Sequence, residues 1–307
     1  MLVITSYFNP MRSRRRLANY RTFRSRLNAP LLTVELSFDG RFELTPSDAD
    51  HLIQLSGGDI MWQKERLLNI ALGAVPGDVE DVAWIDCDLV FESSDWPQAA
   101  KQALKSDNVI QLFSEVRYLD RCSTDKLEYN SIPNLVRSSA GSELRDGEFK
   151  DVCLVRAVST GKCTGPWPAN GFAFAAKKSI ICNTKLYDHG VLDGNDILFL
   201  CAIYGEFEIA KDRLKQNDVQ RRHYVEWARR AQGSFGGRVG FIPGTIYHLW
   251  HGDLANRNYM RRHELMVGFD PYRDVRLATS GAWLWSDPQA ELARNVKDYF
   301  RNRKEDG

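Results

Sequence analysis

The sequence predicts an α/β fold in which helices flank a mainly parallel sheet, with a helical elaboration toward the C-terminus. Across residues 1–116, apolar runs rich in β-branched residues alternate with helical patterns, an order typical of parallel strands joined by helices. The 307 residues contain no internal repeat and no linker-like stretch, which favours a single domain. A composition of 43% hydrophobic and 26% charged residues is typical of a soluble globular protein.

The elements expected in residues 1–116 follow from periodicity and from turn residues. Helical spacing of apolar residues predicts three helices, of which the second ends before Pro76 and the third has Pro97 in its first turn. Strands are expected at 2–8, 31–37, 51–58, 82–91 and 109–116, and helices at 12–27, 61–75 and 94–107.

Residues 117–165 break this alternation, because they are polar and weakly periodic. Irregular or inserted structure is expected there. Beyond them the patterns resume, with a strand and helix at 171–181 and a strand-like run over 239–252 that leads into two histidines. Further helices are expected at 195–207, 221–233, 256–267 and 289–303.

The net charge, the lengths of the apolar runs and the cysteines indicate which kinds of partner and location to expect. The net charge of +1 provides no global field to recruit nucleic acid or membrane. No apolar run approaches the roughly 18 residues that span a bilayer, and the N-terminal residues lack the pattern of a secretion signal. The 6 cysteines are scattered without a CxxC pair, which suits a reducing cytoplasm. A cytoplasmic location is therefore expected.

Two aspartates interrupt the most apolar run of the chain, in DVAWIDCDLVF at 81–91. If the run is one strand, Asp86 and Asp88 point to the same face. Ligands of open parallel sheets bind beyond the carboxyl ends of the strands. Two carboxylates there repel each other unless a cation lies between them. Mg²⁺ or Mn²⁺ that also holds diphosphate oxygens is the usual solution, and a helix-capping acid is the structural alternative.

A second D-x-D pair, Asp48 and Asp50, provides an internal comparison. It follows polar residues rather than an apolar run, and its acids are typical of the start of a helix. Context therefore favours the pair at 86 and 88 as the metal site.

The run VAWIDCDLVF resembles the D-x-D strand of nucleotide-sugar glycosyltransferases with the GT-A fold. Other segments resemble, in order, a poorly characterised bacterial and phage branch of that class, over most of the chain except 117–165. They are YFNP, the arginine-rich helix with NYRTF, MWQKERLLNIAL, LYDHGVLDGNDILFL, HLWHGDLANRNYMRR and FDPYRDV. The resemblance implies a nucleotide-sugar-binding half at 1–116, a variable insertion at 117–165, and an acceptor and metal-completing half at 166–307.

The resemblance also implies roles for the acidic residues. Asp86 is expected to contact the ribose or the metal, and Asp88 to ligate the metal. The segment LDGND lies where the class has an acid near the acceptor, so Asp193 or Asp196 is the candidate general base.

One histidine of HLWHG is expected to complete the metal sphere. His248 and His251 lie three positions apart, so in an extended strand they face opposite sides and only one reaches the metal. The sequence leaves open which of the two it is.

The N-terminal segment offers candidate contacts to the donor. Seven arginines fall within residues 12–26, and Arg14 and Arg16 are candidates for the diphosphate because guanidinium groups bind phosphate oxygens in pairs. Tyr7 and Phe8 end the first strand and are candidates to stack on a uracil-like base. Lys64, within MWQKERLLNIAL, joins these donor contacts.

The expected activity is metal-dependent transfer of a sugar from a UDP-sugar to an acceptor hydroxyl. The acceptor is either a glycan, lipid or small molecule, or a 5-hydroxymethylpyrimidine in DNA. The basic clusters at 12–26 and in NRNYMRRH favour DNA, whereas the neutral chain does not. Trp167 is a candidate sugar or acceptor platform. The rivals are a sugar nucleotidyltransferase and a nucleic-acid-binding protein without catalysis.

Overall fold

A seven-stranded sheet forms the centre of the structure, a computed structural model that describes residues 1–126, 135–144, 168–258 and 261–307. In spatial order its strands are β10 (Gly240–Phe241), β6 (Val109–Gln111), β9 (Ala173–Lys177), β4 (Asp81–Ile85), β1 (Leu2–Phe8), β2 (Leu31–Ser37) and β3 (His51–Ser56). All neighbours are parallel except β9, which is antiparallel to β4 and β6. The predicted α/β fold with a mainly parallel sheet is confirmed.

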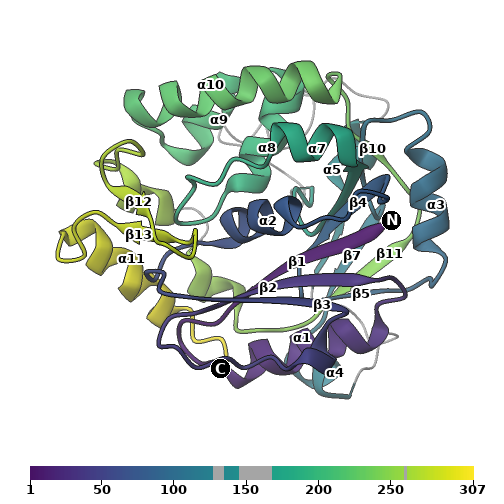
Figure 1. Ribbon diagram of the computed structural model, residues 1–307, viewed down its shortest axis with the longest axis horizontal. Coiled ribbons are helices and arrows are strands. Elements are labelled where there is room, and N and C mark those ends of the chain that lie inside the picture. The colour runs from purple at the N-terminus through teal and green to yellow at the C-terminus, as the bar shows by residue number, and fades with distance from the viewer. Residues whose placement is uncertain (127–134, 145–167, 259–260) are drawn as a thin grey trace.

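Helices cover both faces of this sheet (Figure 1). One face carries α2 (Lys64–Gly73), α7 (Lys178–Thr184), α8 (Asn195–Tyr204), α9 (Phe207–Leu214) and α10 (Asp218–Phe235). The other face packs on α1 (Arg14–Arg26) and α3 (Trp96–Ala103). Side chains of β4 alternate between the two cores, Trp84 with the first and Ala83 with the second. This two-sided burial explains why the central strands are almost wholly apolar.

A second sheet of four strands lies beside the first, in the order β5 (Leu89–Phe91), β11 (Thr245–His248), β7 (Glu115–Tyr118) and β8 (Leu135–Ser138). The helices α4 (Arg121–Lys126) and α5 (Ala140–Leu144) flank β8 in the chain. The described parts of 117–165 therefore form regular elements, and the prediction of irregular structure is wrong for them. The alternation of apolar and polar residues in these elements is too short to be recognised in the sequence. The strand β8, for example, has only 4 residues and pairs along one edge alone.

Three predicted strand runs, 82–91, 109–116 and 239–252, are each divided between the two sheets. Ile85 ends β4 and pairs with Ala173 of β9, whereas Leu89 pairs with His248 of β11. Asp86 to Asp88 thus lie in the link between two sheets and not in a strand. The run 109–116 is likewise divided into β6 and β7. An apolar run does not reveal such a break, because both sheets bury their strands.

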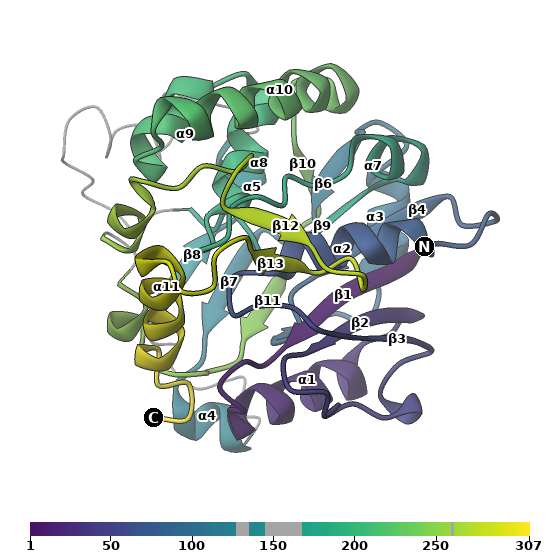
Figure 2. The ribbon, with the colours of Figure 1, turned by 60° about the vertical axis from the view of Figure 1, so that its left-hand side comes forward.

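The C-terminal part adds the remaining elements. The helix expected at 256–267 is wrong: Asn258 takes a positive φ of 44° after the 3₁₀ turn η3 (Leu254–Arg257), and a second 3₁₀ turn, η4 (Arg262–Met266), follows. A hairpin of β12 (Val275–Leu277) and β13 (Trp283–Trp285) leads to α11 (Glu291–Asn302). A short 3₁₀ turn, η1 (Pro46–Asp48), precedes β3. Figures 1 and 2 both show the C-terminus beside α1.

Among the helices of the described ranges, none combines the length and the apolar character that a membrane crossing requires.

Phe174 tests the core between the sheet and α8. Its ring is 1% exposed, stacks on Trp84 at 5.5 Å and meets the edge of Phe199 at 5.4 Å. Phe174→Ala should lower the free energy of unfolding by about 3–5 kcal/mol, because it removes burial and leaves a cavity. Phe42→Ala, at a side chain that is 40% exposed, is the control and should cost less than about 1 kcal/mol. Urea denaturation followed by circular dichroism measures both, and equal losses would contradict this packing.

Candidate active site

One cavity of about 370 Å³ opens at the carboxyl ends of β1 and β4. It is lined by the link that follows β4, by the segment before β9, by the N-terminus of α8 and by the turns after β11. Segments far apart in the sequence meet here because parallel strands end at one edge of the sheet. Its ionisable lining residues are Arg16, Lys64, Asp86, Cys87, Asp88, Tyr118, Arg137, Asp193, Asp196, Arg213, His248, His251, Arg257, Arg262, His263 and Arg303.

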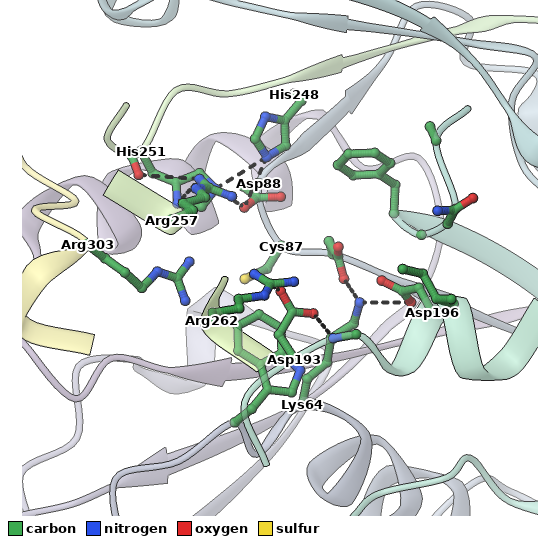
Figure 3. Close-up of a pocket in the computed structure, with 18 of the residues that line it drawn as sticks. Lys64, Cys87, Asp88, Asp193, Asp196, His248, His251, Arg257, Arg262 and Arg303 are labelled. Carbon is green, nitrogen blue, oxygen red and sulfur yellow. Dashed lines mark hydrogen bonds and ion pairs between the residues drawn. The ribbon is translucent and has the colours of Figure 1, made fainter. Parts of the chain in front are cut away.

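Asp88, His248 and His251 form a compact group at one end of the cavity (Figure 3). Oδ2 of Asp88 lies 2.9 Å from Nε2 of His251 and 3.8 Å from Nε2 of His248. The two ring nitrogens lie 3.3 Å apart. β11 ends at His248 and the chain then turns. Both imidazoles therefore reach the carboxylate, and the expectation that they face opposite sides is wrong.

The pKa shifts of Asp88 and His248 suit metal ligands. Burial alone would raise the pKa of Asp88. His248, His251 and Arg16 lower it by more than burial raises it, so the net pKa lies below its usual range. Burial lowers the pKa of His248 to about 3, against the opposing effect of Asp88. At neutral pH the group thus consists of an ionised carboxylate and an imidazole with a free lone pair.

A divalent cation fits this donor set. Oδ1 of Asp88 is buried and has no hydrogen-bond partner within the described part of the chain, which leaves a carboxylate oxygen free for a ligand. One carboxylate and two imidazoles suit Mn²⁺ and related cations. Arg257 donates from Nη2 to Nε2 of His251 at 2.7 Å. The guanidinium must move off this nitrogen when a cation binds.

Asp86 belongs to a different cluster. Its Oδ1 lies 2.6 Å from Nζ of Lys64, and Oδ1 of Asp196 lies 3.5 Å from the same nitrogen. Burial raises the pKa of Asp86 to about 7, with Lys64 opposing the shift. Burial would lower the pKa of Lys64, but the carboxylates of Asp196, Asp86 and Glu65 raise it well above its usual value. The two aspartates of D-x-D face different partners, because the link between the sheets turns them apart.

The candidate bases Asp193 and Asp196 both line the cavity but differ in surroundings. Arg262 lies 2.8 Å from Asp193, and the Gly194 N–H donates to its Oδ1 at 2.6 Å. Burial opposes these contacts, yet the net pKa of Asp193 is lowered. Asp196 has the opposite net shift, because burial raises its pKa more than Lys64 lowers it. A Cβ on Gly171 would overlap the Asp196 carboxylate, so glycine is needed there.

Of the residues predicted to contact the donor, some line the cavity and others do not. Arg16 and Phe8 line the cavity, with the guanidinium 5.3 Å from the ring centre. Tyr7 does not line it: the side chain is 1% exposed, its hydroxyl donates to Glu43 and its ring meets Tyr20. Phe8 is 2% exposed, so neither ring offers a free face for stacking on a base. Arg14 is exposed and lies outside the cavity lining. Trp167 falls outside the described residues.

Several residues in or beside the cavity were not predicted from the sequence. Trp62 and Arg303 pack together, with the guanidinium 5.6 Å from the indole centre. Glu305 Oε1 lies 3.0 Å from Arg16 and 2.9 Å from Arg303. Arg303 ends the predicted C-terminal helix, and no role was predicted for it. Arg213 lies on α9, for which no helix was predicted. No local motif marks Arg213, Arg303 or Glu305, because the sequence separates them from the D-x-D pair by more than a hundred residues.

Comparisons with known proteins return distant likenesses only. No protein-family profile matches the chain, and no curated protein matches it. A glucosyl-3-phosphoglycerate synthase from Mycobacterium tuberculosis, solved with Mn²⁺, UDP and phosphoglyceric acid, has 12% identity and a TM-score of 0.38 over 80% of this chain and 69% of its own. TarS from S. aureus has 10% identity and a TM-score of 0.38 over 88% of this chain and 40% of its own.

The galactosyltransferase LgtC, solved with donor and acceptor sugar analogs, has 10% identity and a TM-score of 0.31 over 99% of this chain and 96% of its own. At these scores the likenesses assign no activity to this chain. The function has to be argued from the cavity itself.

The pH dependence of the free energy of unfolding provides a test of the environment of His263. Burial lowers the pKa of this side chain to about 3, from an ordinary value of 6.5. Between these values the unfolded chain binds the extra proton, so stability is complete above pH 6.5 and falls as the pH drops. Between pH 7 and pH 5 this side chain alone should cost roughly 2 kcal/mol. Urea midpoints of wild type and His263→Asn at both pH values measure it.

The variant should lose less stability on acidification than the wild type, by about that amount. His51→Asn is the control because His51 is exposed, and it should keep the wild-type dependence. Identical pH dependence in all three proteins would mean that His263 is solvated.

Proposed function

We propose that this chain is a metal-dependent glycosyltransferase that moves a sugar from a nucleoside diphosphate donor, such as a UDP-sugar, to an acceptor hydroxyl. The observation that carries the proposal is a buried acid–histidine–histidine group within a strongly cationic cavity. Seven Arg and Lys side chains and four carboxylates line that cavity. A site that combines ligands for a hard cation with surplus guanidinium groups suits a substrate with a diphosphate.

Asp88, His248 and His251 would hold the cation. When bound, it would neutralise the negative charge that develops on the departing diphosphate. Arg257 stands against His251 at 2.7 Å, and Arg16 is buried nearby with Glu305 at 3.0 Å. These two guanidinium groups are therefore placed to bind diphosphate oxygens at the same end of the cavity.

Asp196 is the better candidate for the general base. A base needs a pKa that brings it close to working pH, and burial raises the pKa of Asp196, whereas that of Asp193 is lowered. Asp193 is also held by Arg262 at 2.8 Å. Lys64, between Asp86 and Asp196, keeps two nearby carboxylates in one cavity. Asp86 contacts the donor rather than the cation in this proposal.

The arginines that favoured a DNA acceptor in the sequence do not lie as such an acceptor would require. Arg15 pairs with Asp125 at 2.6 Å and packs over Trp250, and Arg16 faces the cavity. Arg262 is 5% exposed. The N-terminal arginines therefore do not form one phosphate-binding surface, and the proposal takes a small acceptor in place of DNA.

Hydrolysis of a panel of UDP-sugars in the presence of Mn²⁺ tests the proposal, with UDP release as the readout. Asp88→Asn should reduce the metal-dependent rate by at least about 100-fold, because it removes a charged ligand and adds an amide donor toward the histidines. Asp78→Asn, at an exposed turn residue, is the matched control. The reading fails if folded Asp88→Asn keeps near-wild-type turnover, or if UDP-sugars are cleaved to UMP and a sugar 1-phosphate instead of UDP.

The two histidines should act together on metal affinity. His248→Ala and His251→Ala should each weaken Mn²⁺ binding by roughly 10–100-fold, since both ring nitrogens face the same carboxylate oxygen. Mn²⁺ titration followed by electron paramagnetic resonance measures this without any substrate. His51→Ala should bind like the wild type. A normal affinity in either active-site variant would remove that histidine from the ligand set.

A further inference from the structure

Phe172, just before β9, has a backbone conformation that a bulky residue rarely adopts. Its φ is 77°, in the left-handed region where a side chain crowds the backbone. The N–H of Ala173 donates to the carbonyl of Gly171 at 3.1 Å. A hydrogen bond between residues two positions apart, across a residue with such a φ, makes a strained γ-turn. Gly171 and Phe172 line the cavity, and strain of this kind is concentrated at functional sites.

Contacts on several sides hold this turn in place. The carbonyl of Phe172 accepts from the Asp86 N–H at 2.8 Å. The ring packs edge to face with Phe113 at 6.1 Å and with Tyr118 at 5.8 Å between ring centres. It also packs edge to face with the imidazole of His248 at 5.3 Å. The turn therefore connects the link after β4 with a residue of the candidate metal site.

Aromatic rings, rather than a hydrogen bond, hold the imidazole of His248. Its Nε2 lies 3.8 Å from Asp88 and 3.3 Å from His251 (Figure 3). Among the described residues, no group forms a hydrogen bond with its other nitrogen, Nδ1. Such a bond ordinarily orients a histidine that binds a metal. Tyr118 at 5.0 Å and Phe172 at 5.3 Å are the rings that can fix the imidazole in its place.

His251 is oriented in a different way. Arg257 approaches its Nε2 at 2.7 Å and its Nδ1 at 2.9 Å, and Oε1 of Glu305 lies 3.7 Å from Nδ1. Polar and charged groups therefore determine the orientation of this imidazole. For His248 the same task falls to packing, and one of the two rings that provide it stands on a strained backbone.

We propose that Phe172 is a positioning residue of the candidate metal site. Its γ-turn holds the ring against His248, and the ring fixes the imidazole so that Nε2 can bind the cation together with Asp88. The inference rests on the proposed function, because the cation belongs to that proposal. In this role Phe172 acts through His248 alone. The strained conformation is retained for the orientation of the imidazole and not for the stability of the fold.

Two truncations of Phe172 separate positioning from stability. Phe172→Ala removes the ring and keeps a side chain at positive φ, whereas Phe172→Gly removes the ring and relieves the strain. The glycine variant should therefore have the higher urea midpoint. Both should bind Mn²⁺ more weakly by the same factor, roughly 10-fold to 100-fold. Titration with Mn²⁺ alone, followed by electron paramagnetic resonance, measures the affinity. A purely structural residue would instead give affinities that follow the urea midpoints.

Two further variants provide the rescue and the control. Phe172→Tyr keeps an aromatic ring against His248 and should bind Mn²⁺ nearly as the wild type does. Phe174→Leu changes a ring of β9 that is 1% exposed, packs in the core on the other face of the sheet and lies outside the cavity lining. It should lower the urea midpoint and leave the Mn²⁺ affinity unchanged.

The outcomes separate this inference from the proposed function. If folded Phe172→Gly binds Mn²⁺ as tightly as the wild type, Phe172 has no positioning role and the proposed function is unaffected. Affinities that follow the urea midpoints through all four variants would also overturn the inference. If Mn²⁺ affinity depends on the ring but the loaded wild type releases no UDP from any UDP-sugar, the proposed function falls and the positioning role stands. A wild type that binds no Mn²⁺ would overturn both.

Discussion

The link between β4 (Asp81–Ile85) and β5 (Leu89–Phe91) is the constraint on which the site depends. The chain leaves one sheet after Ile85 and joins the other at Leu89. The three residues between them must turn, and the turn sends Asp86 toward Lys64 and Asp88 toward His251. Two carboxylates one residue apart are thereby placed in two groups with different partners. A continuous strand would hold them on one face, where their repulsion would need a cation at all times.

This separation gives the cavity two ends of different chemistry. At the Asp88 end, neutral imidazole and an ionised carboxylate provide ligand atoms. At the Asp196 end, burial raises the pKa of the carboxyl group. The ammonium group of Lys64 stands between Asp86 and Asp196 and pairs with both. A reaction that needs both charge stabilisation and proton removal suits such a division, because each carboxylate is adapted by its own surroundings.

The sequence predicted the parallel sheet and most helices because those elements are long and periodic. It also singled out Asp88, His248 and His251, which follow apolar runs and which the structure brings together. It could not predict that 82–91 is divided, because β4 and β5 are both largely buried and no glycine or proline marks the break. It also missed Arg213, Arg303 and Glu305. Their positions depend on the packing of α9 and of the C-terminal segment, and no pattern in the local sequence encodes such long-range contacts.

The C-terminal segment explains why the proposed function places the diphosphate with the arginines and not at the first helix. In many α/β folds an anion binds at the N-terminus of the helix after the first strand. Here Asp306 occupies that position at α1 (Arg14–Arg26), accepting from the Ser13 hydroxyl at 2.8 Å and from the Arg15 N–H at 2.9 Å. Its neighbour Glu305 contacts Arg16 at 3.0 Å. The chain itself therefore satisfies the helix dipole, while the guanidinium of Arg16 still faces the cavity. In the proposed function a diphosphate would thus be held by side chains and a cation rather than by helix backbone. Donor binding would then depend on the metal, in agreement with the buried oxygen of Asp88 that has no hydrogen-bond partner among the described residues.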